Sequence, residues 1–330
     1  MNGKGALLTF SDETASDFLK DAEFQFLDES SGAGLNETAL EPSSAQSISS
    51  AKPSSPSTGS SASRQGYPDT SSPSSSGSLP RTVTVSTAEE LVNAIDSDTT
   101  ILLNDGVYNL SSISRGAFST NKKYWETVYD GKQLFIQQVN NLTIQGASPN
   151  CQIIVTPRYA NVLSFSNCTN IKIMNITAGH TPAGECMGGV FWFDKCTDVQ
   201  IDNCRMYGCG TDGLYLEKVR NMRVTNSSVY ECTNSIMYVL DSYDILFYNC
   251  TFRDTDVYDQ LVTITGTQEF RIDNCRFNDN RSSDTGMFYV LDSTGIVVKD
   301  SAFNRNTAKY LDDSGLVSFQ SNEYSGNSFD

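Results

Sequence analysis

Six segments of the chain share one pattern, a short apolar strand followed by a polar residue at a fixed place. They are 171–177 "IKIMNIT", 199–206 "VQIDNCRM", 222–229 "MRVTNSSV", 245–252 "ILFYNCTF", 270–277 "FRIDNCRF" and 297–303 "VVKDSAF". The polar residues are Asn175, Asn203, Asn226, Asn249, Asn274 and Asp300, in steps of 28, 23, 23, 25 and 26 residues. This pattern indicates an internal repeat, which decides the fold.

A second set of strands precedes the first and keeps the same spacing. Its central residues are Ser164, Trp192, Tyr215, Tyr238, Thr263 and Tyr289, again 28, 23, 23, 25 and 26 residues apart. Such a period, with two or more short strands and no helix per unit, is typical of a β-solenoid. We therefore predict coils stacked in register at about 4.8 Å.

The column of Asn residues has a structural explanation in such a fold. Asn tolerates the left-handed backbone conformation that a tight turn requires. Stacked amide side chains also satisfy one another by hydrogen bonding when they are buried. We predict that the six residues from Asn175 to Asp300 form a structural ladder whose side chains point inward.

The chain divides before the repeat begins. Residues 43–80 contain 17 Ser and five Pro, a composition that cannot bury enough apolar surface to offset the entropy of ordering. We predict a disordered linker there, a mostly disordered acidic segment at 1–42 and the solenoid at 81–330. The apolar residues within 12–29 leave open a short docking helix for a protein partner.

A short helix is expected at the start of the solenoid. Residues 86–95, "STAEELVNAI", place Thr87 and Glu90 as a capping box. No helical period follows between this segment and residue 330. The sequence therefore predicts an all-β domain with one N-terminal capping helix.

The charge of the protein excludes several classes of partner. With 23 Lys and Arg against 39 Asp and Glu, the net charge is −16. Nucleic acid is not expected as a partner, because phosphate binding needs a basic surface. No apolar run approaches the roughly 18–20 residues that span a bilayer, and the N-terminus lacks the layout of a signal peptide. The sequence leaves the localisation open.

Nine cysteines occupy columns of the repeat, and their number is odd. Free Cys is among the most buried residue types, so we predict buried packing thiols, with one or more disulfides as the alternative. The single histidine, His180, stands in a Gly- and Pro-containing segment, and the Cys pairs lack the spacing of zinc ligands. No metal site and no cofactor are predicted.

The chain resembles the right-handed parallel β-helix proteins of the pectin-lyase-like superfamily, uncharacterised bacterial members in particular. The resemblance covers about residues 82–325 and rests on 85–95 "VSTAEELVNAI", 101–110 "ILLNDGVYNL", 140–146 "NNLTIQG" and the Asn-bearing coils. It implies a single-stranded right-handed β-helix and suggests an extracellular or cell-surface location. It implies no particular activity, because the superfamily includes enzymes and non-catalytic surface domains.

Strand alternation places the central residues of the second set on the outer face. We predict a glycan-binding face, since aromatic rings suit sugar rings and carboxylates accept hydrogen bonds from their hydroxyls. The predicted binding residues are Trp192, Tyr215, Tyr238, Tyr289, Asp194 and Glu217. The alternative is that a loop, such as residues 113–130, covers this face.

Catalysis is a weaker hypothesis. Asp194 and Glu217 lie on neighbouring coils, roughly 5 Å apart by strand spacing, and could share a proton as paired carboxylates in acid–base catalysis do. The alternative function is therefore a polysaccharide lyase or glycoside hydrolase, and Ca²⁺ enters only in the lyase case. The motifs that polygalacturonase-type enzymes use are absent from the sequence. A structural or protein-binding module is the third possibility, and we expect a non-catalytic glycan-interacting domain.

The predicted linker can be tested by limited proteolysis of the full chain. Cleavage should begin within residues 43–80 and leave the solenoid resistant, because disorder exposes the backbone to the protease. Mass spectrometry of the first fragments locates the cuts. Uniform digestion along the chain would contradict the boundary near residue 81.

Overall fold

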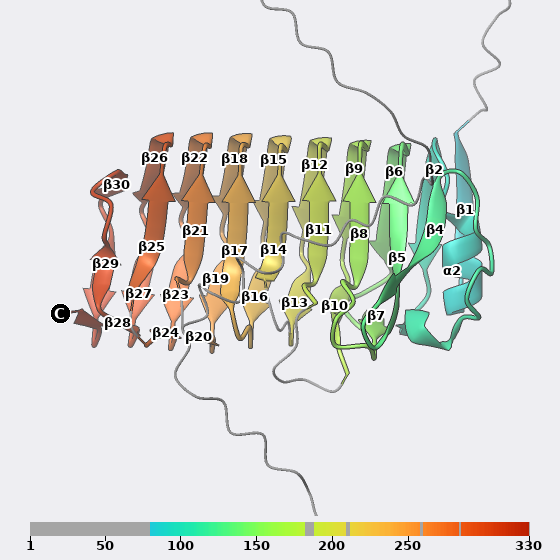
Figure 1. Cartoon of the computed structure of the whole chain (residues 1–330), viewed down its shortest axis with the longest axis horizontal. Coiled ribbons are helices and arrows are strands. Elements are labelled where there is room, and N and C mark those ends of the chain that lie inside the picture. Colours follow the sequence, from blue (N-terminus) through green and yellow to red (C-terminus); the bar gives the residue numbers. More distant parts are fainter. Residues whose placement is uncertain (1–79, 182–187, 209–211, 258–259, 284, 330) are drawn as a thin grey trace, which may run out of the picture. The chain divides into compact units, whose positions relative to one another are not determined.

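The computed structural model describes residues 80–181, 188–208, 212–257, 260–283 and 285–329. Within them the chain forms a parallel β-helix, which confirms the predicted all-β solenoid. Successive coils lie side by side, and their strands align into three long sheets and one short sheet (Figure 1). The predicted acidic segment and linker lie outside the described residues, so the three-part organisation of the chain stays a prediction.

We name the sheets A to D. Sheet A consists of β1 (Arg81–Val85), β2 (Thr99–Leu103), β6 (Asn140–Gly146), β9 (Thr169–Met174), β12 (Thr197–Asp202), β15 (Arg220–Thr225), β18 (Tyr243–Tyr248), β22 (Gln268–Asp273), β26 (Thr294–Lys299) and β30 (Val317–Gln320). Sheet B consists of β3 (Gly106–Asn109), β7 (Cys151–Val155), β10 (Thr177–His180), β13 (Arg205–Tyr207), β16 (Ser228–Tyr230), β19 (Thr251–Arg253), β23 (Arg276–Asn278), β27 (Ala302–Asn304) and β31 (Glu323–Ser325).

Sheet C consists of β4 (Lys123–Val128), β5 (Gly131–Gln137), β8 (Leu163–Ser166), β11 (Phe191–Asp194), β14 (Asp212–Glu217), β17 (Ser235–Leu240), β21 (Val262–Thr265), β25 (Gly286–Leu291) and β29 (Tyr310–Asp312). Sheet D consists of β20 (Asp256–Val257), β24 (Arg281–Ser282), β28 (Thr307–Ala308) and β32 (Ser328–Phe329). A coil passes through sheets A, B and C in that order, and the later coils add a strand of sheet D.

The strands pair in the register that the sequence spacing predicts. Trp192 pairs with Ser164 on one side and with Tyr215 on the other, and Tyr215 pairs with Tyr238. The residues that alternate with them point inward and are fully buried. On one side of the central residues these are Leu163, Phe191, Leu214, Met237, Val262 and Phe288.

Identical positions of successive coils stack in the core. The rings of Phe165 and Phe193 lie 5.0 Å apart and almost parallel, and those of Phe277 and Phe303 lie 4.8 Å apart. Burying one such side chain contributes about 1.5–3 kcal/mol. The core is therefore a set of apolar columns that run along the helix axis.

The Asn column marks the turn from sheet A to sheet B. Its six members have φ between 49° and 54°, which confirms the predicted left-handed conformation. Their predicted inward orientation is wrong: Asn175 is half-buried and the other five are exposed. The chain bends toward the interior at this residue, so its side chain projects outward. Amide hydrogen bonds then run along the outside, as from Asn203 Nδ2 to Asn175 Oδ1 at 2.9 Å and from Asn249 Nδ2 to Asn226 Oδ1 at 2.7 Å.

The residue after each turn is buried and needs a partner for its backbone N–H. The N–H of Cys204 donates to Ser227 Oγ at 3.0 Å, and that of Cys275 donates to Ser301 Oγ at 2.9 Å. These side-chain acceptors belong to the next coil. From Cys204 to Ser301, small residues with an oxygen or sulfur atom therefore fill the column that follows the Asn residues, and Ile176 occupies its first position.

A buried amide ladder does exist, but at another turn. Asn306 Oδ1 accepts from the backbone N–H and the side-chain amide of Asn280, at 3.1 and 3.0 Å. Asn306 Nδ2 donates to the carbonyl of Phe277 at 2.8 Å and to Asn327 Oδ1 at 3.0 Å. Asn280 and Asn306 are at most 1% exposed. The sequence pattern predicted the right interaction but assigned it to the wrong column.

Helix α2 (Ala88–Ala94) covers the core beside β1 and β2 (Figure 1). Its capping box is formed as predicted: the N–H of Glu90 donates to Thr87 Oγ1 at 3.1 Å, and the Glu90 carboxylate accepts from the N–H of Thr87 at 3.2 Å. Arg81 donates to the carbonyl of Ala94 at the other end of the helix. The described residues include no helix with the length and apolar character needed to cross a membrane.

Six of the seven described cysteines are free and buried, as the thiol hypothesis predicts. They are Cys151, Cys168, Cys196, Cys204, Cys250 and Cys275. Cys232 is disulfide-bonded, so the disulfide alternative applies to that residue. Cys186 and Cys209 lie outside the described residues.

Replacing Asn306 by Ala should destabilise the solenoid. Each buried polar group left without a partner costs about 1–3 kcal/mol, and the substitution leaves several. Asn226→Gly is the control, because it keeps the left-handed turn at an exposed site and should cost within about 0.5 kcal/mol. Urea denaturation measures both, and similar losses in the two variants would contradict the buried ladder.

Candidate functional site

Five aromatic side chains follow one another across sheet C. They are Tyr124, Phe135, Trp192, Tyr215 and Tyr238, and we call them the aromatic column. Successive ring centroids are 5.0, 5.5, 6.5 and 5.1 Å apart. Phe135 is 9% exposed, and the other four side chains are half-buried. The column therefore presents four half-buried rings, and Phe135 is nearly enclosed between Tyr124 and Trp192.

Two positions interrupt the predicted outer face. Ser164 is fully buried, and the rings of Phe135 and Trp192 meet across it. Thr263, which is 8% exposed, separates Tyr238 from Tyr289 in the register. Tyr289 thus lies in the predicted row but beyond the continuous run of rings.

Residues 113–130 do not cover the column in the way the alternative hypothesis required. Strand β4 pairs antiparallel with β5, and Tyr124 stands opposite Phe135. The hairpin therefore extends sheet C and lengthens the column. Trp125 points the other way: it is 8% exposed, and its indole N–H donates to the carbonyl of Ala117 at 2.9 Å.

Sequence reasoning missed Tyr124 and Phe135 because neither belongs to the regular repeat. A local signal was available in the dipeptide Asp130-Gly131, which is typical of hairpins, although the two turn residues in the structure are Tyr129 and Asp130. The alternating residues on both sides of that turn would have predicted two strands. Their pairing places both rings beside Trp192.

The stacking geometry decides which ring surfaces a ligand can contact. Tyr215 and Tyr238 are nearly parallel, at 9° and 5.1 Å, so each covers one face of the other. Trp192 is tilted by 50° to Phe135 and by 46° to Tyr215. The tyrosines thus offer mainly ring edges and hydroxyl groups, whereas the indole of Trp192 is less enclosed.

The two predicted carboxylates lie beside the column and are neutralised. Asp194, which is 7% exposed, accepts from Ser166 Oγ at 2.8 Å and pairs with Lys195 Nζ at 2.9 Å. Glu217, its neighbour in the register, pairs with Lys218 Nζ at 2.6 Å. Each carboxylate therefore has its own ammonium partner, on the next residue of the chain.

A second polar row lies at the start of the sheet C strands. The backbone N–H of Asn161 donates to Gln133 Oε1 at 2.8 Å. The side-chain oxygen Oδ1 of Asn161 accepts from the N–H of Gly189 at 2.8 Å. Asp212, 6% exposed, accepts a hydrogen bond from the hydroxyl of Ser235. Burial raises the pKa of Asp212 to about 6, although the bond from Ser235 opposes this shift. Sequence reasoning did not identify Asp212.

His180 is a packed residue rather than a surface group. It is 1% exposed, and its Nε2 lies 2.7 Å from the carbonyl oxygen of Ala160. Burial lowers the pKa of His180 below its usual value, which favours the neutral ring. In the part of the chain that the structure describes, no three or more His, Cys, Asp or Glu side chains are placed to hold a metal ion.

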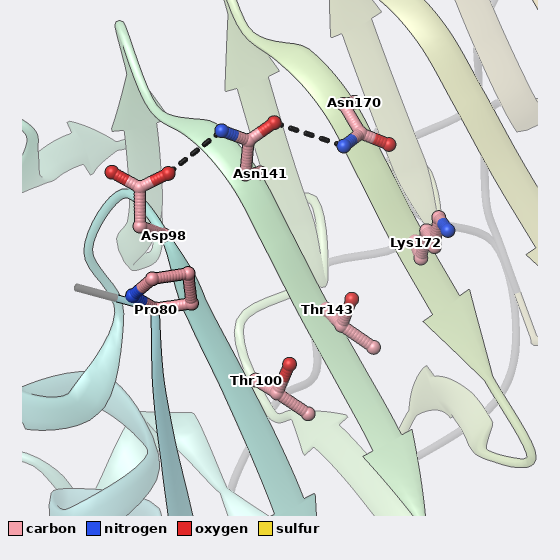
Figure 2. A pocket seen from close by; sticks show the side chains of 7 residues that line it. All are labelled: Pro80, Asp98, Thr100, Asn141, Thr143, Asn170 and Lys172. Carbon is pink, nitrogen blue, oxygen red and sulfur yellow. Dashed lines mark hydrogen bonds between the residues drawn. The ribbon is translucent and has the colours of Figure 1, made fainter.

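A separate open pocket of about 230 Å³ lies on sheet A (Figure 2). It is lined by Pro80, Asp98, Thr100, Asn141, Thr143, Asn170 and Lys172. Hydrogen bonds of 2.7 and 2.9 Å link Asp98, Asn141 and Asn170 along one side. The lining carries no aromatic ring, so its chemistry differs from that of the aromatic column.

The buried carboxyl group of Asp212 predicts a pH-dependent stability. Its pKa is about 6 in the folded chain against 3.8 for a free carboxyl. The folded state thus binds the proton more tightly, and its free energy of unfolding falls as the pH rises from about 4 to about 6. Asp212→Asn should not lose stability over this pH range. Above pH 6 its free energy of unfolding should therefore exceed that of the unmodified protein by up to roughly 3 kcal/mol.

Urea midpoints of both proteins at pH 4, 5, 6 and 7 measure the effect. Asp292→Asn, at an exposed turn position, is the control for removing one carboxylate. A difference between Asp212→Asn and the unmodified protein that stays constant with pH would contradict the assignment.

Comparison with solved structures relates the fold to that of two enzymes. A pectate lyase from Paenibacillus sp. 0602 matches with a TM-score of 0.54 at 9% identity, over 75% of this chain and 78% of that chain. A pectin methylesterase from Aspergillus niger matches with a TM-score of 0.50 at 12% identity, over 72% and 80%. At these identities the likeness concerns the fold alone.

The ORF18 protein of Geobacillus virus E2 matches with a TM-score of 0.40 at 13% identity, over 73% of this chain and 57% of that chain. This chain thus spans little more than half the length of that viral protein. No curated protein matches the sequence. The family model described as "Right handed beta helix region" matches residues 128–329. The chain therefore belongs to the right-handed β-helix family.

Proposed function

We propose that the aromatic column of sheet C binds a neutral polysaccharide chain that lies along the stacking direction of the coils. The observation that carries this proposal is the series of ring contacts from Tyr124 to Tyr238, in which four of the five rings are half-buried and Phe135 is 9% exposed. Neighbouring strands repeat at roughly 4.8 Å, which is comparable with the length of one sugar unit. A linear glycan can thus meet Trp192, Tyr215 and Tyr238 on three successive coils.

The rings contribute in two ways. Trp192, tilted against both neighbours, supplies an apolar surface on which the C–H face of a sugar can rest. Tyr215 supplies a hydroxyl group at the ring edge. Burial raises the pKa of Tyr215 to about 12, so the phenol stays protonated at neutral pH and can donate to a sugar oxygen. The binding mode is therefore one indole platform with tyrosine hydrogen bonds, rather than stacking on every ring.

The charges beside the column favour a neutral ligand. Lys195 and Lys218 neutralise the two adjacent carboxylates, and the whole chain carries −16. A polyanion would meet a repulsive field, and the described residues offer no cluster of metal ligands to counter it. A neutral polysaccharide avoids this repulsion.

The structural neighbours support a carbohydrate as the ligand. Two of them, with TM-scores of 0.54 and 0.50, are by name a pectate lyase and a pectin methylesterase. Carbohydrate binding by this chain is thus consistent with its fold, and we extend the proposal to an extracellular or cell-surface location.

Binding without cleavage fits the carboxylates better than catalysis does. A glycosidase needs one carboxyl group held protonated and a second one ionised. Asp194 and Glu217 instead each pair with a lysine of their own, at 2.9 and 2.6 Å, so the two carboxylates have the same kind of partner rather than the contrasting environments that an acid and a base require. Loss of a measured cleavage activity in Asp194→Asn would instead establish the enzyme alternative.

Trp192→Ala should weaken binding to an immobilised array of neutral glycans by about 1–3 kcal/mol, by analogy with bases stacked on aromatic platforms. Tyr215→Phe removes only the hydroxyl group and should cost about 0.5–1.5 kcal/mol of binding with little change in stability. The matched control is Tyr243→Ala, which removes a tyrosine from sheet A that is 45% exposed.

Thermal denaturation of the same variants separates binding from folding. If Trp192→Ala unfolds like a core truncation, with a loss of about 3–5 kcal/mol, its ring is structural. If both variants stay folded and bind as the unmodified protein does, the column is not the site.

A further inference from the structure

Two tyrosines outside the aromatic column are far more exposed than its members. The side chain of Tyr129 is 88% exposed and that of Tyr159 is 42% exposed. Their ring centroids lie 5.0 Å apart with the planes inclined at 51°. We call them the tyrosine pair. Because the rings are inclined, they form an open angle instead of covering each other face to face.

The backbone beneath the tyrosine pair is held in place. The carboxylate of Asp130 accepts the N–H of Arg158 at 2.5 Å and that of Tyr159 at 3.1 Å. Gly131 approaches Pro157 so closely that a Cβ atom there would lie 2.5 Å from the proline ring. The hairpin turn and the segment before β8 are thus locked together, and the pair needs little ordering before a ligand binds.

The tyrosine pair lies to one side of the aromatic column, on the same coils as Phe135 and Ser164. Tyr129 precedes β5, and Gly131, where β5 begins, is four residues or roughly 13 Å along the strand from Phe135. Gln133 and Asn161 lie between, bonded to each other by the Asn161 N–H. A polysaccharide that follows the aromatic column runs across the strands of sheet C. It therefore passes the tyrosine pair at a distance of two to three sugar units.

We propose that the tyrosine pair is a second sugar-binding subsite that receives a side branch of the polysaccharide. The inference rests on the proposed function, because the column must hold the main chain. A residue of that chain near Phe135 and Trp192 directs its substituent along the strands, over Gln133 and Asn161, toward Tyr129. The ligand class is therefore a neutral polysaccharide with short branches, and an unbranched chain leaves the pair empty.

Matched pairs of oligosaccharides test the proposal on the full chain. One pair is cellotetraose and the xyloglucan nonasaccharide built on the same four-glucose backbone, whose branches include galactosyl-xylose disaccharides. The second pair is linear mannopentaose and the same backbone bearing a galactosyl-galactose branch, because only a branch of two or more sugars spans the roughly 13 Å to the tyrosine pair. Calorimetry should show that the unmodified protein binds the branched member of at least one pair about tenfold more tightly than the linear member.

Tyr129→Ala should abolish this preference and leave the affinity for the linear member unchanged. Trp192→Ala should weaken both members by the same factor, and Tyr243→Ala should change neither. Saturation-transfer NMR gives a second readout: transfer from aromatic protons to the branch sugar should disappear in Tyr129→Ala. Because Tyr129 is 88% exposed, this variant is expected to fold normally.

The outcomes distinguish the two proposals. Equal affinity for linear and branched members, or an equal loss of both in Tyr129→Ala, overturns the branch subsite and leaves the column intact as a site. If Trp192→Ala binds both members as tightly as the unmodified protein does, the aromatic column is not the site of the main chain. No binding of any probe by the unmodified protein overturns the assignment of a neutral branched ligand.

Discussion

Parallel pairing of each coil with the next, residue by residue, is the constraint on which the rest of the structure depends. Trp192 cannot lie anywhere but between Ser164 and Tyr215 once β11 pairs with β8 and β14. Any side chain that recurs at one position of the repeat therefore becomes a column along the axis. Core rings, external amides and the outer aromatic side chains are all consequences of this single register.

At the turns, strand pairing does not supply an acceptor for every buried backbone N–H group. A left-handed residue such as Asn203 breaks the ladder, and the next N–H is buried without a backbone acceptor. Ser227 supplies the missing oxygen from the following coil, and Cys275 supplies a sulfur atom to Cys250 in the same way, at 3.3 Å. Cys204, Cys250 and Cys275 thus have a structural reason, because a small buried side chain that accepts a hydrogen bond satisfies the turn N–H of the preceding coil.

The sequence was sufficient for the register but not for the direction of every side chain. Alternation predicted that Phe191 and Leu214 are buried, because orientation within a strand follows from the period of two. It could not predict that Asn226 points outward, since a left-handed turn interrupts that period. The burial of Asp212 was likewise hidden, because it depends on Ser235 and other residues of neighbouring coils. Tyr124 and Phe135 required a hairpin that the repeat does not contain.

An aromatic column in which every ring is stacked face to face on the next would offer a ligand little ring surface. The positions where stacking is incomplete therefore decide where a ligand can contact the aromatic column. Rings in strict register cover one another's faces, as Tyr215 and Tyr238 do at 9°. At Ser164 the column lacks a ring, and Trp192 tilts toward Phe135 across the gap. The most exposed rings at this end of sheet C, Tyr129 at 88% and Tyr159 at 42%, lie at the β4–β5 hairpin and beside it, where the repeat is irregular. The departures from the solenoid pattern, rather than the pattern itself, favour recognition at this end of sheet C.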